Sequence, residues 1–145
     1  MILFRHQLIV DSCDQQIVDT YSWSTHNRGY AITRINGRVS YLHRLICPTY
    51  TTVDHINGNK LDNRRCNLRE CTVTQNNQNV TKRKTNTSGY KGVVHRKERN
   101  LWIAQIRLNG VPKFIGSYST PEQAALAYNK KAIELHGEFA NINII

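Results

Sequence analysis

The chain has 145 residues and a formal net charge of +10, with 20 Lys and Arg against 10 Asp and Glu. This length fits one ordinary domain or two small ones. The excess of positive charge indicates a polyanionic partner, and nucleic acid is the leading candidate because neutralised phosphates release counterions. A membrane surface is the competing partner, but the sequence has neither a long apolar run nor a basic amphipathic helix.

The first apolar segment, residues 1–11, is too short for a signal peptide and is interrupted by Arg5 and His6. We therefore expect an intracellular protein with no membrane partner. The four cysteines form no CxxC pair, so neither a zinc knuckle nor a disulfide framework is indicated.

A β-hairpin is predicted in the first half of the chain. Residues 30–35 and 38–46 are rich in β-branched and aromatic side chains and flank Asn36-Gly37, the strongest short signal for a two-residue turn. Such a turn fixes the register. The expected cross-strand pairs are Arg34 with Val39, Ile32 with Tyr41 and Tyr30 with His43.

His43 and Arg44 fall near the end of this predicted hairpin. Two interpretations of His43 stay open at this point: a histidine packed among aromatic and aliphatic side chains with one hydrogen bond, or a contact to phosphate or metal near a site that follows in the chain. In the second interpretation both residues are candidate DNA contacts.

The stretch from Val53 to Asn79 carries the side chains most suited to chemistry. It begins with Asp54-His55, passes through the turn-forming residues 57–59 and reaches a capping-box sequence, residues 72–75, that predicts a helix start. A strand end and a helix start can hold Asp54 and Asn76 opposite each other, and two oxygen ligands suit a hard divalent cation such as Mg²⁺. His55 is then a candidate general base for phosphodiester hydrolysis. The alternative is a polar surface loop with a solvated Asp-His pair.

The spacing in this stretch closely resembles the HNH nuclease motif of the ββα-metal fold, with Asn67 at 13 and Asn76 at 22 residues after Asp54. The resemblance implies that Asp54 and Asn76 bind the metal, with Mg²⁺ expected and Mn²⁺ as the alternative. It also implies that His55 is the general base and that the Asn67 amide braces the loop that aims His55. Many members of the family have His where this chain has Asn76, which weakens the ligand field without forbidding catalysis.

Basic residues inside and after this motif are candidate phosphate contacts. Lys60 and Arg64 lie inside it, and each is equally explained as part of a solvated surface. Residues 79–88 are polar and read as a basic linker, which would either follow the DNA backbone or minor groove or act as a soluble tether. The candidate contacts in the linker are Lys82, Arg83 and Lys84. This linker would join a domain of residues 1–78 to a second domain of residues 89–145.

The second domain is predicted to be a three-stranded antiparallel sheet packed on one helix, which makes the whole chain an α+β protein. Residues 90–96, 101–108 and 111–118 read as strands. Thr120 and Pro121 mark the start of a helix that Gly137 ends. Alternation along the middle strand divides it into two faces: Trp102, Ala104 and Ile106 toward the helix, and Ile103, Gln105 and Arg107 on the open face.

The segments GYKGV, WIAQIR and FIGSYSTPEQAALAY closely resemble the Apetala/ethylene-response-factor DNA-binding domain, and the likeness spans Ser88 to Asn143. The resemblance implies that the open face of the sheet enters the DNA major groove. The implied contacts are Lys91, Arg96, Gln105, Arg107 and Phe114. Val94 and Pro112 stand where plant domains often have arginine, and Gln105 replaces a glutamate, so the docking mode carries over while the base specificity does not. The alternative is a small α+β module with a solvated face.

Together the two resemblances favour an HNH endonuclease of the homing or nicking type found in phages and introns, acting on double-stranded DNA and on no small molecule. One active site per chain favours nicking by a monomer, whereas a double-strand cut would need a dimer or a second event. The alternatives are a non-catalytic DNA-binding regulator and a protein that binds or cuts structured RNA.

Overall fold

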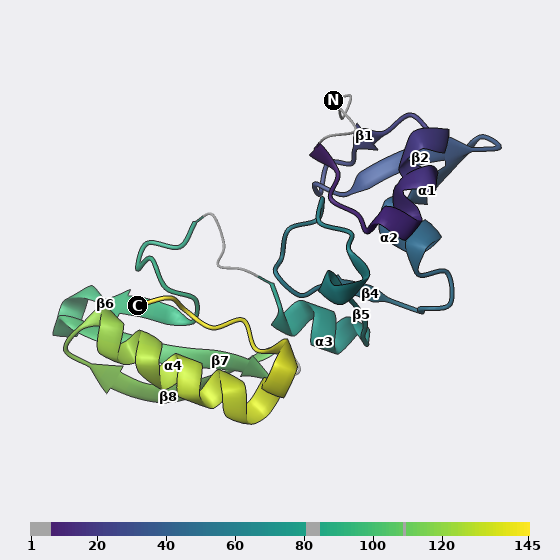
Figure 1. Ribbon diagram of the computed structural model, residues 1–145. Helices are drawn as coiled ribbons and strands as arrows, with labels where there is room; N and C mark the ends of the chain where they lie inside the picture. Colours follow the sequence, from purple (N-terminus) through teal and green to yellow (C-terminus); the bar gives the residue numbers. More distant parts are fainter. Residues whose placement is uncertain (1–6, 81–84, 109) are drawn as a thin grey trace. The chain divides into compact units, whose positions relative to one another are not determined.

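The computed structural model describes residues 7–80, 85–108 and 110–145, and it shows a mixed α/β protein with small antiparallel sheets and few helices (Figure 1). That class agrees with the prediction. The chain divides into two compact units, Met1–Asn76 and Asn77–Ile145. Lys82, Arg83 and Lys84 of the predicted linker lie outside the described residues. None of the helices in the described ranges has the length and apolar character needed to cross a membrane.

The N-terminal unit holds two small sheets among short helices. Its elements in chain order are η2 (Ser12–Asp14), α1 (Gln15–Thr20), β1 (Ser24–Thr25), β2 (Ala31–Ile35), β3 (Arg38–Tyr41), α2 (Leu42–Ile46), β4 (Val53–His55), η3 (Arg65–Asn67), β5 (Leu68–Glu70) and α3 (Val73–Gln78).

The hairpin β2–β3 has the predicted register, with Arg34 opposite Val39 and Ile32 opposite Tyr41. Its turn is formed by Asn36 and Gly37, whose φ angles of 49° and 77° are both positive. Two consecutive positive φ angles are typical of the tight turn whose twist matches that of the strands. The turn residues therefore set the pairing of the strands, and β1 adds a third strand beside β2.

The prediction of a strand through residue 46 was wrong, because residues 42–46 form α2. Leu42 and Ile46 are 0% and 2% exposed. In a strand, Leu42, Arg44 and Ile46 would share one face, and burying the two apolar side chains would bury Arg44 with them. A helix places residues four apart on one side and leaves Arg44 exposed. His43 consequently has no cross-strand partner in β2.

A buried apolar cluster supports both sheets of the N-terminal unit. Its members come from the N-terminal segment, from α1, α2 and strands β2, β4 and β5, and from residues that adjoin β1 and α2: Leu8, Val18, Trp23, Ala31, Leu42, Ile46, Cys47, Val53 and Leu68. Val53 and Leu68 belong to the antiparallel pair β4–β5, in which Asp54 lies opposite Arg69 and His55 opposite Leu68. The cluster thus fixes the two short strands on which the Asp-His pair is carried.

Helix α3 begins with the predicted capping box. The backbone N–H of Gln75 donates to Thr72 Oγ1 at 3.2 Å, and the backbone N–H of Thr72 donates to Gln75 Oε1 at 2.8 Å. These two bonds satisfy N–H groups that have no partner inside the helix.

The C-terminal unit is a three-stranded antiparallel sheet in the order β6–β7–β8 followed by one long helix (Figure 1). Its elements are β6 (Val93–Arg96), η4 (Lys97–Arg99), β7 (Leu101–Leu108), β8 (Val111–Tyr118), α4 (Pro121–His136) and η5 (Gly137–Phe139). Thr120 caps α4 by accepting a hydrogen bond from the Gln123 N–H, and Pro121 occupies the first turn, where its missing N–H is not needed.

Small side chains bring α4 close to the sheet. Ala104 of β7 packs with Ala124 and Ala125, and Ile106 packs with Tyr128 and Ala132.

Gly92, which directly precedes β6 and has a φ of 75°, lies against the Tyr128 side chain of α4. A Cβ atom there would lie 2.1 Å from Tyr128 Cδ2 and 2.6 Å from the Gln105 carbonyl oxygen. Only glycine therefore fits between the helix and the sheet at this point.

Candidate active site

Asp54 and His55 end strand β4, and each is 4% exposed. Arg69, directly opposite on β5, donates to Asp54 Oδ2 from Nε at 2.9 Å and from Nη2 at 2.7 Å. A buried carboxylate needs such a partner, because an unpaired charge in a poorly solvated position is costly. Arg69 is thus an ion-pair partner of Asp54, the residue that the motif resemblance singles out as a metal ligand.

His55 lies among polar and aromatic side chains. Its Nε2 is 3.2 Å from Asn63 Oδ1, and its ring centroid is 5.3 Å from that of His43 and 5.9 Å from that of Tyr30. Burial lowers the pKa of His55, and the hydrogen bond to Asn63 and the charge of Asp54 oppose this effect only in part. The imidazole is therefore mainly neutral at pH 7, the state that a general base requires.

Asn63 is a site residue that the sequence analysis missed. It is 0% exposed, and its Nδ2 lies 3.5 Å from the Lys60 carbonyl oxygen, which directs its Oδ1 toward His55. The only signal in the sequence was an asparagine eight residues after His55 in an asparagine-rich loop. A spacing of eight residues within a loop matches neither the helical nor the strand period, so the contact between Asn63 and His55 could not be predicted from the sequence.

Asn67 closes the loop between the two strands. Its Oδ1 accepts a hydrogen bond from the Asn57 N–H at 3.0 Å, and its Nδ2 donates to the Asp62 carbonyl oxygen at 2.7 Å. The Asn57 side chain also donates to Asp62 Oδ2 at 2.9 Å. The buried Asn67 side chain therefore ties the start of the loop to its end. Asn63 is the residue that follows Asp62 in this loop.

His43, at the start of α2, is buried beside the same aromatic rings. Its ring centroid is 5.3 Å from that of Tyr30 and 5.4 Å from that of Tyr41. Its Nδ1 is buried and has no hydrogen-bond partner within the described ranges. Burial, followed by the effects of His55 and Arg44, lowers the pKa of His43 to about 3. Packing with rings is thus observed, and the expected single hydrogen bond is not found at Nδ1.

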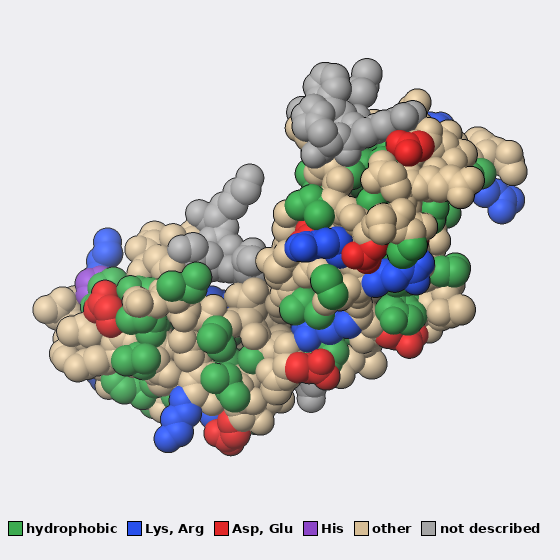
Figure 2. Space-filling view, viewed as in Figure 1, with side chains coloured by type: hydrophobic (Ala, Val, Ile, Leu, Met, Phe, Trp, Pro, Cys, Tyr) green, Lys and Arg blue, Asp and Glu red, His purple; other side chains and the backbone are tan. Residues whose placement is uncertain are grey.

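Basic side chains near the loop have partners within the protein. Lys60 Nζ donates to the Arg28 carbonyl oxygen at 2.7 Å and lies 4.5 Å from the centre of the Tyr30 ring. Arg64 forms an ion pair of 2.7 Å with Asp62. Figure 2 shows Lys and Arg side chains beside Asp and Glu on the visible surface of this unit. To contact DNA, Lys60 and Arg64 would therefore have to give up these interactions within the protein.

Arg44 lies on the surface of the same unit. Its Nη1 donates to the Tyr50 carbonyl oxygen at 2.7 Å.

Asn76 lies in α3, is half-buried, and donates its backbone N–H to the Thr72 carbonyl oxygen at 3.0 Å. Three or more His, Cys, Asp or Glu side chains that could share a metal do not come together within the described ranges. The expected ligands, the Asp54 carboxylate and the Asn76 carboxamide, would be a different donor set. Both supply hard oxygen atoms, and a set this small leaves positions for water and phosphate, as Mg²⁺ commonly requires. The chemistry of Asp54 and Asn76 therefore fits that ion.

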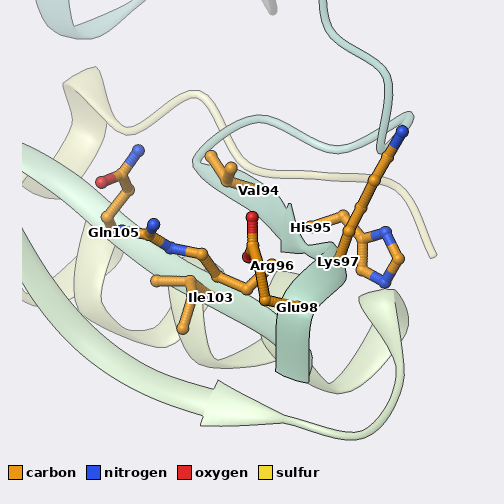
Figure 3. Close-up of a pocket in the computed structure, with 7 residues that line it drawn as sticks. All are labelled: Val94, His95, Arg96, Lys97, Glu98, Ile103 and Gln105. Carbon is orange, nitrogen blue, oxygen red and sulfur yellow. The ribbon is translucent and has the colours of Figure 1, made fainter. Parts of the chain in front are cut away.

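The C-terminal unit has a shallow hollow of about 320 Å³ on its sheet, lined by Val94, His95, Arg96, Lys97, Glu98, Ile103 and Gln105. Figure 3 shows Arg96 extending along the sheet toward Gln105, while Lys97 points away. Phe114 on β8 is 67% exposed, and the exposed Arg107 lies 3.3 Å from the Gly110 carbonyl oxygen through Nη1. Four of the five residues that the second resemblance singled out thus lie on this sheet.

Lys91 differs from the other four. It precedes β6, is half-buried, and donates from Nζ to the Gln78 carbonyl oxygen at 2.7 Å. Burial lowers its pKa to about 8.

Comparison with known proteins places this site in a family. The HNH endonuclease family model matches residues 40–78, the segment that holds α2, β4, β5 and α3. An uncharacterised HNH endonuclease of Acanthamoeba polyphaga mimivirus is 39% identical over 137 residues, which cover 89% of this chain and 70% of that protein. The chain belongs to the HNH endonuclease family.

Two further relatives match parts of the chain. Protein 3.8 of Escherichia phage T7 is 38% identical over 88 residues, covering 61% of this chain and 72% of the phage protein. An ethylene-responsive transcription factor of Arabidopsis thaliana is 43% identical over 56 residues, covering 37% of this chain and 30% of the plant protein. The likeness to the plant transcription factor is therefore limited to a part of each chain.

Proposed function

We propose that this protein is a metal-dependent DNA endonuclease in which β4, β5 and α3 form a ββα-metal site. The observation that carries the proposal is the buried His55 beside the buried Asp54, with His55 Nε2 held by Asn63 in a loop that Asn67 closes. Family membership supports nuclease activity in general. The roles of the individual residues and the metal requirement are proposed from the geometry and from the resemblance of the motif.

Asp54 and Asn76 are the proposed metal ligands, with Mg²⁺ as the expected ion and Mn²⁺ as the alternative. When bound there, the ion would stabilise the negative charge that develops on the phosphate and on the leaving oxygen. Arg69 keeps the Asp54 carboxylate in place through two hydrogen bonds.

His55 is the proposed general base, and its hydrogen bond indicates which nitrogen acts. Asn63 directs its carbonyl oxygen at His55 Nε2, so we assign the ring proton to Nε2. Nδ1 is then the nitrogen that accepts a proton from the attacking water. Asn67 supports this arrangement indirectly, because it closes the loop from which Asn63 projects.

The C-terminal unit is proposed to hold the duplex by the open face of its sheet. Arg96, Gln105, Arg107 and Phe114 are the proposed contacts, since Arg and Gln can read base edges in the major groove. Support comes from the partial likeness to the plant transcription factor and from the antiparallel sheet backed by a single helix. The chain would then act as a two-domain monomer that nicks intracellular double-stranded DNA, with homing as its proposed biological context.

A plasmid-nicking assay tests the proposal. With Mg²⁺ the protein should nick supercoiled DNA, and EDTA should stop the reaction. His55→Ala should lower the rate by about 10²–10⁴-fold, the range typical of a lost general base, while duplex binding persists. His136→Ala, at the end of α4, is the matched control and should retain activity.

A second function is favoured by one observation, the pairing of buried Asp54 with Arg69, which a purely structural role would also explain. In that case the protein is a non-catalytic DNA-binding regulator. Duplex binding by the wild type with no cleavage under Mg²⁺ or Mn²⁺ would support this function and reject the enzyme. Parallel assays on structured RNA would show whether DNA is the preferred substrate.

A further inference from the structure

Tyr30 directly precedes β2 and has no role in the mechanism proposed above, yet its ring lies against the proposed general base. The ring centroid of Tyr30 is 5.9 Å from that of His55 and 5.3 Å from that of His43. The centroids of His43 and His55 are themselves 5.3 Å apart. All three distances lie in the range of favourable ring contacts, so the three rings form a closed triangle inside the N-terminal unit.

The hydrogen bond from Asn63 does not by itself fix the plane of the His55 ring. The torsion about the bond between Cβ and the imidazole has only broad preferences, so the ring can turn unless its neighbours prevent it. Such a turn would displace Nδ1, the nitrogen that is proposed to accept the proton and that must stay within hydrogen-bond reach of the attacking water. Tyr30 and His43 meet the His55 ring at interplanar angles of 50° and 89°. These ring contacts therefore restrict the motion that the hydrogen bond leaves open.

Tyr30 is held through both its backbone and its ring. The His26 N–H donates to the Tyr30 carbonyl oxygen at 2.8 Å, and the Gly29 N–H donates to the His26 carbonyl oxygen at 2.8 Å, which closes a tight turn before β2. Lys60 Nζ lies 4.5 Å from the centre of the Tyr30 ring and donates to the Arg28 carbonyl oxygen at 2.7 Å. A cation over an aromatic face is attracted to it, so Lys60 fastens the ring to the turn.

We propose that Tyr30 and Lys60 are positioning residues for the nuclease site: the Tyr30 ring fixes the plane of the His55 imidazole, and Lys60 holds that ring. This inference rests on the proposed function, since His55 is the proposed general base. Lys60 lies three residues before Asn63. One short loop thus supports both constraints on His55, the hydrogen bond directly and the ring contact through Lys60.

Removal of the ring tests the proposal at saturating duplex and Mg²⁺. Tyr30→Leu should lower the single-turnover nicking rate by about 10²-fold, the loss typical of a misplacement of about 1 Å, with unchanged duplex affinity. Tyr30→Phe keeps the ring and should keep most of the rate. Tyr21→Leu is the matched control and should retain activity, because this half-buried tyrosine of the same unit packs against Trp23. An undiminished rate in folded Tyr30→Leu would overturn the proposal.

A double-mutant cycle shows whether Tyr30 acts through His55. In the His55→Ala background Tyr30→Leu should cause no further loss of rate, because no imidazole is left to orient. If the two losses instead multiply, Tyr30 contributes independently of His55, and the proposal is rejected.

Lys60→Met leaves the Tyr30 ring in place and removes the cation that holds it. The nicking rate should fall, while duplex affinity and its salt dependence stay unchanged. A phosphate contact at Lys60 would instead weaken duplex binding and lower the slope of log affinity against log salt by about 0.9, and this result would contradict positioning. If Tyr30→Leu does not fold, Lys60→Met decides: an unchanged rate rejects the proposal.

NMR of the His55 ring nitrogens measures the orientation without metal or activity. Above pH 7 the wild type should show two well-separated ¹⁵N signals, because Asn63 holds the ring proton at Nε2. In Tyr30→Leu the signals should shift toward each other as the ring turns and the tautomers exchange. Unchanged signals would mean that Tyr30 does not fix His55. If the wild type does not nick DNA, the proposed function fails, whereas these signals still decide the role of Tyr30.

Discussion

Arg69 donates two hydrogen bonds to the same oxygen atom of Asp54, from Nε at 2.9 Å and from Nη2 at 2.7 Å. The two side chains are only 12% and 5% exposed, and they stand directly opposite each other on β5 and β4. The proposed metal ligand is thus part of a largely buried ion pair.

Arg69→Met should destabilise the N-terminal unit by about 3–5 kcal/mol, because it removes the guanidinium group that is paired with a buried carboxylate. Urea unfolding measures the loss. Lys131→Met breaks the more exposed pair with Glu134 and should cost less than about 1 kcal/mol. Equal losses in the two variants would show that Asp54 does not depend on Arg69.

The rate of DNA cleavage should decline on the acid side only below pH 6.5, the ordinary pKa of histidine. Burial lowers the pKa of His55, so the imidazole stays neutral and able to accept a proton into mildly acidic solution. Single-turnover rates between pH 5 and pH 8 at saturating Mg²⁺ measure this limit. An acid limb above pH 6.5 would contradict His55 as the base in this environment.

The stability of the N-terminal unit should fall as the pH is lowered from 7 to 5. The pKa of His43 is about 3 in the folded protein against an ordinary value of 6.5, so the unfolded chain binds more protons in this interval and folding becomes less favourable. His43 alone accounts for a loss of about 2 kcal/mol over these two pH units.

His43→Phe should reduce this pH dependence, as measured by urea unfolding at pH 7 and pH 5. Part of the dependence should persist, because the pKa of His55 is also lowered. Identical pH dependence in the wild type and the variant would show that His43 is not buried in its neutral form.

Arg96→Ala should weaken duplex binding and lower the slope of log affinity against log salt by about 0.9 if the side chain contacts one phosphate. Lys130→Ala removes one positive charge from the exposed surface of α4 and is the control for net charge. Fluorescence anisotropy at several salt concentrations separates the two variants. Equal effects would place the DNA away from the open face of the sheet.

Several features of the fold could be predicted because short-range chemistry leaves one solution. Asn36-Gly37 permits a single turn geometry, and the register of β2 and β3 follows from it. The capping side chains of Thr72 and Thr120 mark where α3 and α4 begin. The helix at residues 42–46 was not predicted, because two buried residues four apart lie on one face of either a strand or a helix. The two structures differ at Arg44, which would be buried in the strand and is exposed in the helix.

Asp54 and His55 are neighbours in sequence, so their placement together at the end of β4 could be read from the sequence, whereas their proposed roles stay predictions. The contact of Asn63 with His55 depends on a loop whose path follows no period. The bond between Lys91 and Gln78 likewise joins residues that no local rule connects. Long-range hydrogen bonds of this kind arise from the folded chain as a whole.

Gly92 and Gly110 have nearly the same φ, 75° and 81°, yet their surroundings differ completely, since a Cβ at Gly110 would meet no atom within 4 Å. Asn36 and Asn100 both adopt a φ of 49° in this protein, so asparagine can replace glycine where only the backbone angle matters. Position 110 should therefore accept asparagine as well as glycine. At position 92 any side chain would collide with Tyr128 and force α4 away from the sheet. We therefore expect homologous proteins to retain glycine there.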